Sequence, residues 1–106
     1  MPLTRSFKET IQARVRRDPA FRRELLREGI DCFLAGDVET GKSILRDYIN
    51  ATVGFSKLSR STRIPPKSIM RMLGPSGNPR AQNIFDIVAT LQEYEGIRLQ
   101  VRSTSA

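Results

Sequence analysis

The chain has 106 residues, of which 39% are hydrophobic, and this is enough for one folded domain with an extension but not for two separate cores. Its 18 basic and 11 acidic residues give a net charge of +7, which predicts a polyanionic partner, either nucleic acid or an acidic membrane surface. We favour nucleic acid, because no segment is long and apolar enough to span a membrane and residues 1–10 lack the apolar stretch of a signal peptide. A cytoplasmic protein without a membrane partner is expected.

The residue types exclude several kinds of chemistry. Histidine is absent and Cys32 is the single cysteine, which excludes a Cys/His zinc site within one chain and any catalytic arrangement that needs imidazole. We expect Cys32 to be a small, buried apolar residue. Tryptophan is absent and aromatic residues are few, which argues against a protein that stacks successive bases of a single strand. No pair of residues suggests a general acid and base in a pocket, so we expect neither an enzyme nor a bound cofactor or metal.

Two helices, residues 7–17 and 19–35, are expected to form an N-terminal extension that covers residues 1–36. A capping box at Ser6 opens the first helix, and an aspartate followed by a proline opens the second. Gly29 lies inside the second helix, where it predicts a kink or a close packing contact.

A third helix, residues 38–52, overlaps a sequence pattern for phosphate binding. Residues 36–43, GDVETGKS, match G-x-x-x-x-G-K-[ST] letter for letter. A P-loop follows a buried parallel strand, whereas the residues before this segment have the pattern of a helix. Asp37 and Glu39 would also place carboxylates beside the phosphates. We therefore do not expect nucleotide binding here.

Residues 55–79 predict two short helices joined by a tight turn. The first ends near Arg63, because a residue that precedes proline avoids the helical region, and the second starts at Pro66. Ile69 and Leu73 share an inward face of the second helix with Met72. The residues expected on its outer face are Lys67, Ser68, Met70 and Arg71.

The charges of this region are one-sided. No acidic residue occurs between Asp47 and Asp86, whereas this interval contains Lys57, Arg60, Arg63, Lys67, Arg71 and Arg80. Charge of one sign favours binding to phosphates, since each neutralised phosphate releases a counterion. The charges alone could equally belong to a solvated basic surface that binds nothing. The spacing of the two short helices favours DNA binding over that alternative.

Residues 81–93 predict an amphipathic helix with Ile84, Ile87, Val88 and Leu91 inward and Phe85 close to that face. Residues 97–101 alternate with a period of two and predict a short C-terminal strand. A lone strand leaves backbone groups unpaired, so we expect it to pair with its copy in a second subunit or with a partner protein. The alternatives are an edge packed on residues 1–4 or a frayed end. Residues 103–106 are expected to form a disordered tail.

Several stretches match one known family. They are LAGD at 34–37, ILRDYINA at 44–51, F-S-x-L-S-x-x-T-x-I from Phe55, K-S-I-M-R-M-L from Lys67 and GNP at 77–79. From Leu34 onward the chain resembles the HigA-like antitoxins and related bacterial regulators of the lambda-repressor-like helix-turn-helix superfamily. The resemblance implies an all-α helix-turn-helix bundle, with residues 37–102 as the DNA-binding domain. It also implies a transcriptional regulator, often an autorepressor paired with a ribonuclease toxin.

By position, the resemblance implies that Ser56 and Lys57 begin the phosphate-contacting helix and that Lys67, Ser68 and Arg71 contact bases or the groove. The family's turn commonly holds glycine where this chain has Arg63, so Arg63 is expected in a left-handed conformation at a cost of about 1 kcal/mol.

The function expected from the sequence is a homodimeric repressor that binds double-stranded DNA at a palindromic operator. The candidate DNA-binding residues are Ser56, Lys57, Arg60, Arg63, Lys67, Ser68, Met70, Arg71, Asn78 and Arg80. The alternative is a protein-interaction module whose helices within residues 7–35 neutralise a small toxin, with DNA binding secondary.

Overall fold

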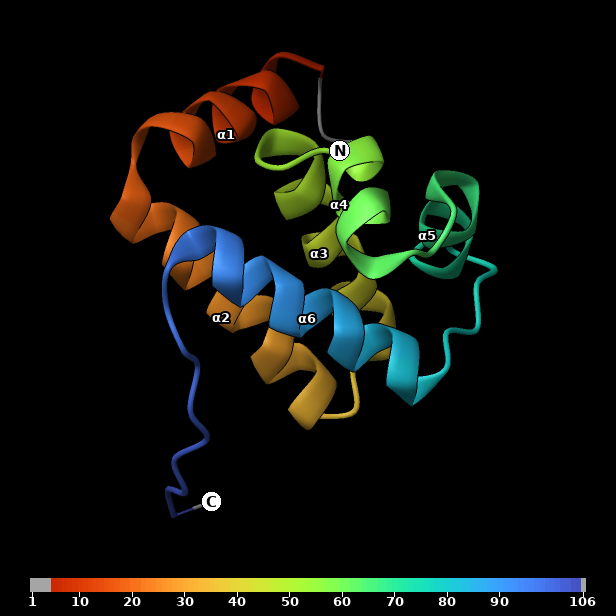
Figure 1. Ribbon diagram of the computed structural model, residues 1–106. Helices are drawn as coiled ribbons and strands as arrows, with labels where there is room; N and C mark the ends of the chain where they lie inside the picture. Colours follow the sequence, from red (N-terminus) through yellow and green to blue (C-terminus); the bar gives the residue numbers. More distant parts are fainter. Residues whose placement is uncertain (1–4, 106) are drawn as a thin grey trace.

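The computed structural model describes residues 5–105, and their side chains from Glu9 onward. These residues form helices and no strand (Figure 1). The helices are α1 (Arg5–Arg17), α2 (Pro19–Leu34), α3 (Val38–Ala51), α4 (Phe55–Thr62), α5 (Pro66–Met72) and α6 (Ala81–Glu95). The expected all-α class is confirmed, and the helix boundaries differ by no more than two residues from those predicted. The capping box at Ser6 lies outside the described side chains.

Two of the helix starts follow directly from the residues that precede them. The backbone N–H of Phe21 donates to Asp18 Oδ1 at 3.1 Å, with Pro19 in the first turn of α2. This hydrogen bond lowers the pKa of Asp18. In the same way the N–H of Thr40 donates to Asp37 Oδ1 at 3.3 Å and opens α3. Each aspartate satisfies a donor that the helix cannot pair internally.

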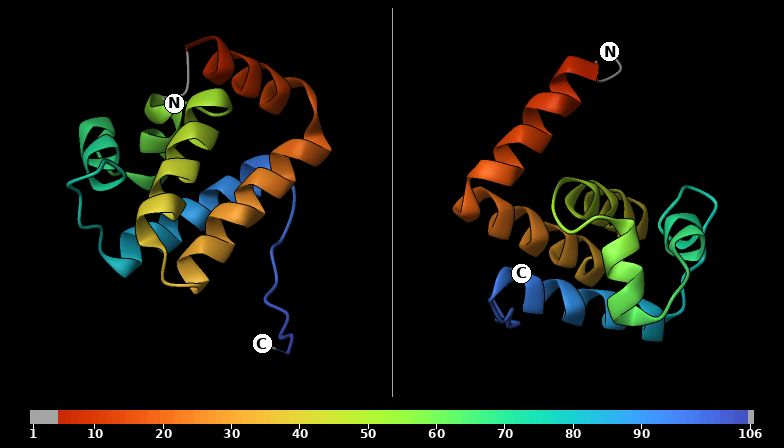
Figure 2. Two further views of the ribbon diagram at one scale, coloured as in Figure 1. Left: turned by 180° about the vertical axis from the view of Figure 1, so that it is seen from behind. Right: turned by 45° about the horizontal axis from the view of Figure 1, so that its top comes forward.

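The core is shared by α2 to α6. Its buried residues are Leu26, Leu45, Tyr48, Ile49, Leu58, Ile69, Leu73, Ile87, Val88 and Leu91. Helix α2 packs along α3, and a Cβ at Gly29 would lie 3.2 Å from Ile44 Cγ2, which confirms the expected close packing (Figure 1). Helices α1 and α5 lie on opposite sides of the molecule (Figure 2). No helix in residues 5–105 has the length and apolar content needed to cross a membrane.

The expected C-terminal strand is absent from the described residues. Residues 97–105 form an extended segment, and the N–H groups of Ile97 and Leu99 donate to the carbonyl and the side-chain oxygen of Gln92, at 3.1 and 2.7 Å. Ile97 and Leu99 are half-buried against the core, as the alternation predicts, whereas Val101, the third position of the pattern, is 77% exposed. A ladder also needs a second strand, and the described part of this chain offers none. Pairing with a second subunit stays a prediction, and packing on residues 1–4 falls outside the described residues.

Two apolar side chains are more exposed than the sequence predicts. Phe85 is 69% exposed, although we placed it close to the inward face of α6. Ile87, Val88 and Leu91 already fill that face, and Phe85 is rotated by roughly 100° from Ile84 about the helix axis. Cys32, expected to be buried, is half-buried.

Candidate nucleic-acid interface

Arg63 joins α4 to α5 in the left-handed conformation. Its φ and ψ are 61° and 24°, and its N–H donates to the carbonyl of Ser59 at 2.7 Å, which caps α4. Arg63 is the one non-glycine residue with a positive φ among residues 5–105, so the expected left-handed turn is confirmed. After it, Pro65 has φ −56° and ψ 142°, and Pro66 occupies the first turn of α5. The left-handed residue and the two prolines together fix where α4 ends and α5 begins.

Helix α5 divides into the two predicted faces. Ile69 and Leu73 are fully buried. Lys67, Met70 and Arg71 are exposed, as predicted from the spacing, whereas Ser68, expected on the outer face, and Met72, expected on the inner face, are both half-buried.

A groove beside α5 brings together four of the candidate residues. It has a volume of about 300 Å³ and runs between α5, the turn that follows it and the start of α6. Its lining residues are Ser68, Arg71, Met72, Ser76, Gly77, Asn78, Pro79, Arg80 and Asn83. None of them is acidic, so the guanidinium groups of Arg71 and Arg80 have no carboxylate beside them in the groove. The groove therefore offers two guanidinium groups, two hydroxyl groups and two side-chain amides to an anionic or polar ligand.

The candidates on α4 do not join this groove. The ammonium of Lys57 lies 5.1 Å from the centroid of the Tyr94 ring, and Lys57 lines a different cleft. Tyr94 is held in place by a hydrogen bond of 2.7 Å between its hydroxyl and that of Ser61. Ser56 and Arg60 are exposed on α4. Lys57 therefore lines a different hollow from Arg71 and Arg80, beside the Tyr94 ring near the end of α6.

Two cations of α3, which the sequence analysis did not select, hold the end of α5. Lys42 is 1% exposed, and its ammonium donates to the carbonyls of Gly74 and Gly77 at 3.0 and 2.9 Å. Arg46, one turn further along α3, donates to the carbonyl of Leu73 at 3.0 Å. The carbonyls at a helix C-terminus lack partners within the helix and carry its negative dipole end. We call Lys42 and Arg46 the α5 clamp, since they fix the end of α5 and the turn after it.

The turn after α5 also depends on a glycine. A Cβ at Gly77 would lie 2.2 Å from the carbonyl oxygen of Arg71 and 2.5 Å from that of Met72. Only glycine allows this approach without a backbone shift. The turn is therefore pressed against the end of α5, which places Asn78 and Arg80 beside Arg71.

The contacts of Lys42 show that the lysine of the P-loop pattern at residues 36–43 is not available to bind a phosphate. The segment 36–43 follows helix α2 and not a strand, and Lys42 has a third contact, an ion pair of 2.8 Å with Glu39. All three donors of its ammonium are thereby used within the protein.

No group of three or more potential metal ligands occurs among the described residues.

Comparison with protein-family models, with curated proteins and with solved structures found no match to this chain. Its function therefore has to be inferred from the geometry of the molecule itself.

Proposed function

We propose that this protein is a sequence-specific, DNA-binding transcriptional regulator. In this proposal α4, residues 63–65 and α5 act as a helix-turn-helix unit, and α5 enters the major groove of the duplex. The observation that carries the proposal is the groove beside α5, in which Ser68, Arg71, Asn78 and Arg80 gather and which no carboxylate lines. The net charge of +7 supports it, since binding to a polyanion requires such an excess.

The side chains around the groove suit separate parts of a duplex. A guanidinium can donate two hydrogen bonds to a guanine edge, and a lysine can donate to the same edge, so Arg71 and Lys67 are proposed as base contacts. Met70, 46% exposed on α5, can contact a thymine methyl group. Arg63 and Arg80 are proposed as phosphate contacts, which position the protein without selecting a sequence.

The remaining candidates receive smaller roles. Ser68 and Asn78 lie in the groove and can hydrogen-bond either bases or phosphates. Ser56, Lys57 and Arg60 lie on α4 outside the groove, and we propose them as flanking phosphate contacts. Two copies on a palindromic operator would place two α5 helices in successive major grooves, as expected for a homodimeric repressor.

The test is a comparison of variants on binding sites selected from a random duplex library. Arg71→Ala is expected to cost about 1–3 kcal/mol on the selected site and to change the preferred bases. Arg80→Ala should weaken all sequences alike and lower the slope of log affinity against log salt by about 1. The matched control is Arg98→Ala, which removes the same charge from the exposed C-terminal segment. If Arg71→Ala and Arg98→Ala weaken every sequence to the same small extent, the groove does not bind DNA bases.

A protein-interaction module, such as an antitoxin that covers a toxin with its N-terminal helices, remains the second candidate. The described part of α2 supports it less well, because its apolar side is used within the protein. Its outer side carries Arg27 in ion pairs of 2.6 Å with both Glu24 and Asp31. Leu34, at the end of α2, is the large apolar side chain of this helix that is highly exposed, at 63%. The paired charges along the rest of the outer side offer no apolar anchor for a partner. Co-expression with the adjacent genes tests this candidate, and a stable complex that no longer binds duplex DNA would favour it.

A further inference from the structure

A second and larger cleft lies where α1 and α2 meet the ends of α3 and α6 and the start of α4. Its volume is about 570 Å³. Its lining residues are Arg16, Pro19, Arg22, Arg23, Tyr48, Ala51, Thr52, Val53, Lys57, Tyr94 and Glu95. Among the candidate DNA-binding residues, Lys57 alone contributes to it.

The one carboxylate of this cleft is already occupied. The side chain of Glu95 is 3% exposed, and Arg22 Nε lies 2.8 and 2.9 Å from its two oxygens. The Tyr48 hydroxyl also donates to Glu95. The hydrogen bond to Glu95 raises the pKa of Arg22, and burial, followed by the same carboxylate, raises that of Tyr48. The charge of Glu95 is therefore balanced within the protein and does not repel an anion in the cleft.

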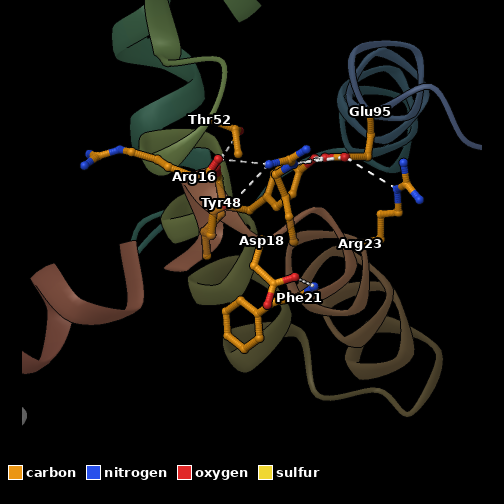
Figure 3. A network of polar contacts seen from close by, with 9 residues as sticks. Arg16, Asp18, Phe21, Arg23, Tyr48, Thr52 and Glu95 are labelled. Carbon is orange, nitrogen blue, oxygen red and sulfur yellow. Dashed lines mark hydrogen bonds and ion pairs between the residues drawn. The ribbon is translucent and has the colours of Figure 1, made fainter. Parts of the chain in front are cut away.

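Arg22 also fixes the rim of the cleft. Its Nη1 donates to the carbonyls of Val15 and Arg16 at 3.1 and 3.3 Å, which are among the last carbonyls of α1. The backbone of Arg16 is thus tied to the same network that joins α2, α3 and α6 (Figure 3). The backbone at the rim of the cleft is therefore fixed to α2, α3 and α6 before a ligand arrives.

Positive charge remains in excess once the Arg22–Glu95 pair is set aside. Arg23 is 53% exposed and lies 3.7 Å from Glu95, too far for a hydrogen bond. The guanidinium of Arg16 has no hydrogen bond or ion pair within the described residues, and it extends away from Glu95 (Figure 3). Lys57 completes the set at the Tyr94 ring.

We propose that this cleft binds a small molecule that carries a diphosphate group. Three cations in excess match the charge of a diphosphate better than that of a single carboxylate, and the guanidinium fork donates to phosphate oxygens in pairs. The volume falls within the range of small-molecule pockets, roughly 300–1,000 Å³. Pro19, Val53 and the Tyr94 ring supply apolar surface for the rest of the ligand. Because the site is concave, the convex backbone of a duplex would not fill it.

Occupation of the site would connect the N-terminal helices to α4. Arg16 comes from α1, Arg23 from α2 and Lys57 from α4, and α4 leads through the turn at Arg63 into α5. The inference goes beyond the proposed function, since binding in the cleft needs no duplex.

The test is a titration with inorganic pyrophosphate at constant ionic strength, followed by tyrosine fluorescence. The chain has two tyrosines and no tryptophan, and both tyrosines line the cleft, so the signal reports on this site. Wild type is expected to give a saturable change. The double variant Arg16→Gln with Arg23→Gln should weaken the affinity at least about tenfold, because it removes two charge-assisted contacts. The matched control is Arg98→Gln with Arg102→Gln, which removes the same charge from the C-terminal segment and should leave the affinity unchanged.

Two results would overturn the proposal. One is the absence of a saturable change in wild type, or an equal loss in the two double variants, which would indicate general charge screening. The other concerns the double variant Arg16→Gln with Arg23→Gln. If it loses as much duplex affinity as Arg71→Ala but gives an unaltered pyrophosphate titration, the cleft is part of a DNA-binding surface. Failure of DNA binding alone would leave the pyrophosphate result standing, so the two proposals fail separately.

Discussion

The α5 clamp makes the clearest quantitative prediction, through the substitution Lys42→Met. Methionine keeps most of the apolar stem of Lys42 but removes the donors to the carbonyls of Gly74 and Gly77. Hydrogen bonds from a charged donor contribute roughly 1.5–3 kcal/mol each. These figures are net contributions, which already include the cost of taking the ammonium out of water. Water can also reach the two half-buried glycine residues.

The balance leaves an expected loss of about 2–3 kcal/mol in the free energy of unfolding. For a domain of this size that is a fall in melting temperature of roughly 10–20 °C. The total stability of such a domain is about 5–15 kcal/mol, so the variant should still fold. Thermal and urea denaturation followed by circular dichroism measure both quantities.

The same substitution is expected to weaken duplex binding, although Lys42 itself is buried. Without the clamp, the turn after α5 no longer holds Asn78 and Arg80 beside Arg71. Affinity should be measured by fluorescence anisotropy at a temperature at which the variant is fully folded. The control is Glu39→Gln, which removes the charge of the solvent-exposed partner of Lys42 but keeps an oxygen that can accept from the ammonium, so it should cost less stability than Lys42→Met. If Lys42→Met is as stable as wild type and binds DNA as tightly, the clamp has no role in positioning the groove.

Three further predictions concern single positions. Arg63→Gly should raise the free energy of unfolding by about 0.5 kcal/mol in urea denaturation. Glycine relieves the strain of the left-handed conformation, and this gain is partly offset by the larger entropy of glycine in the unfolded chain. A loss of stability would contradict the strain at Arg63. Gly77→Ala should cost more than about 2 kcal/mol, whereas Gly74→Ala, whose Cβ would lie 3.3 Å from the nearest backbone oxygen, should cost much less. Burial raises the pKa of Tyr48 above its usual value of 10.0, so the unfolded chain loses the phenol proton at a lower pH than the folded protein does. The free energy of unfolding should therefore fall as the pH rises above 10, and it should fall less in Tyr48→Phe. An equal fall in both proteins would rule out Tyr48 as its source.

Much of the helical framework could be predicted from local chemistry. Asp18 and Asp37 cap α2 and α3 where an aspartate before a helical pattern predicts a start. The inward and outward residues of α5 follow from the spacing of Ile69 and Leu73. The left-handed conformation of Arg63 was expected from the family resemblance, and the end of α4 near Arg63 from the proline that follows Ile64.

The rest depends on contacts between distant parts of the chain. Lys42 stands three residues before Leu45 on the buried stripe of α3, and that spacing was an available sign of burial. Its partners lie 32 and 35 residues away, however, so no local pattern could identify the carbonyls that pair with it. The position of Lys57 likewise depends on Tyr94 at the far end of α6. Residues 97–101 have the alternation of a strand, but alternation describes burial and not the presence of a pairing partner.

The burial of Lys42 has a practical consequence for chemical labelling. An amine-reactive reagent should modify the exposed Lys57 and Lys67 of the folded protein at once, whereas Lys42 can react only when α3 and the turn after α5 separate. The rate at which mass spectrometry detects a label on Lys42 would therefore report how often this part of the molecule opens, without any substitution in the chain.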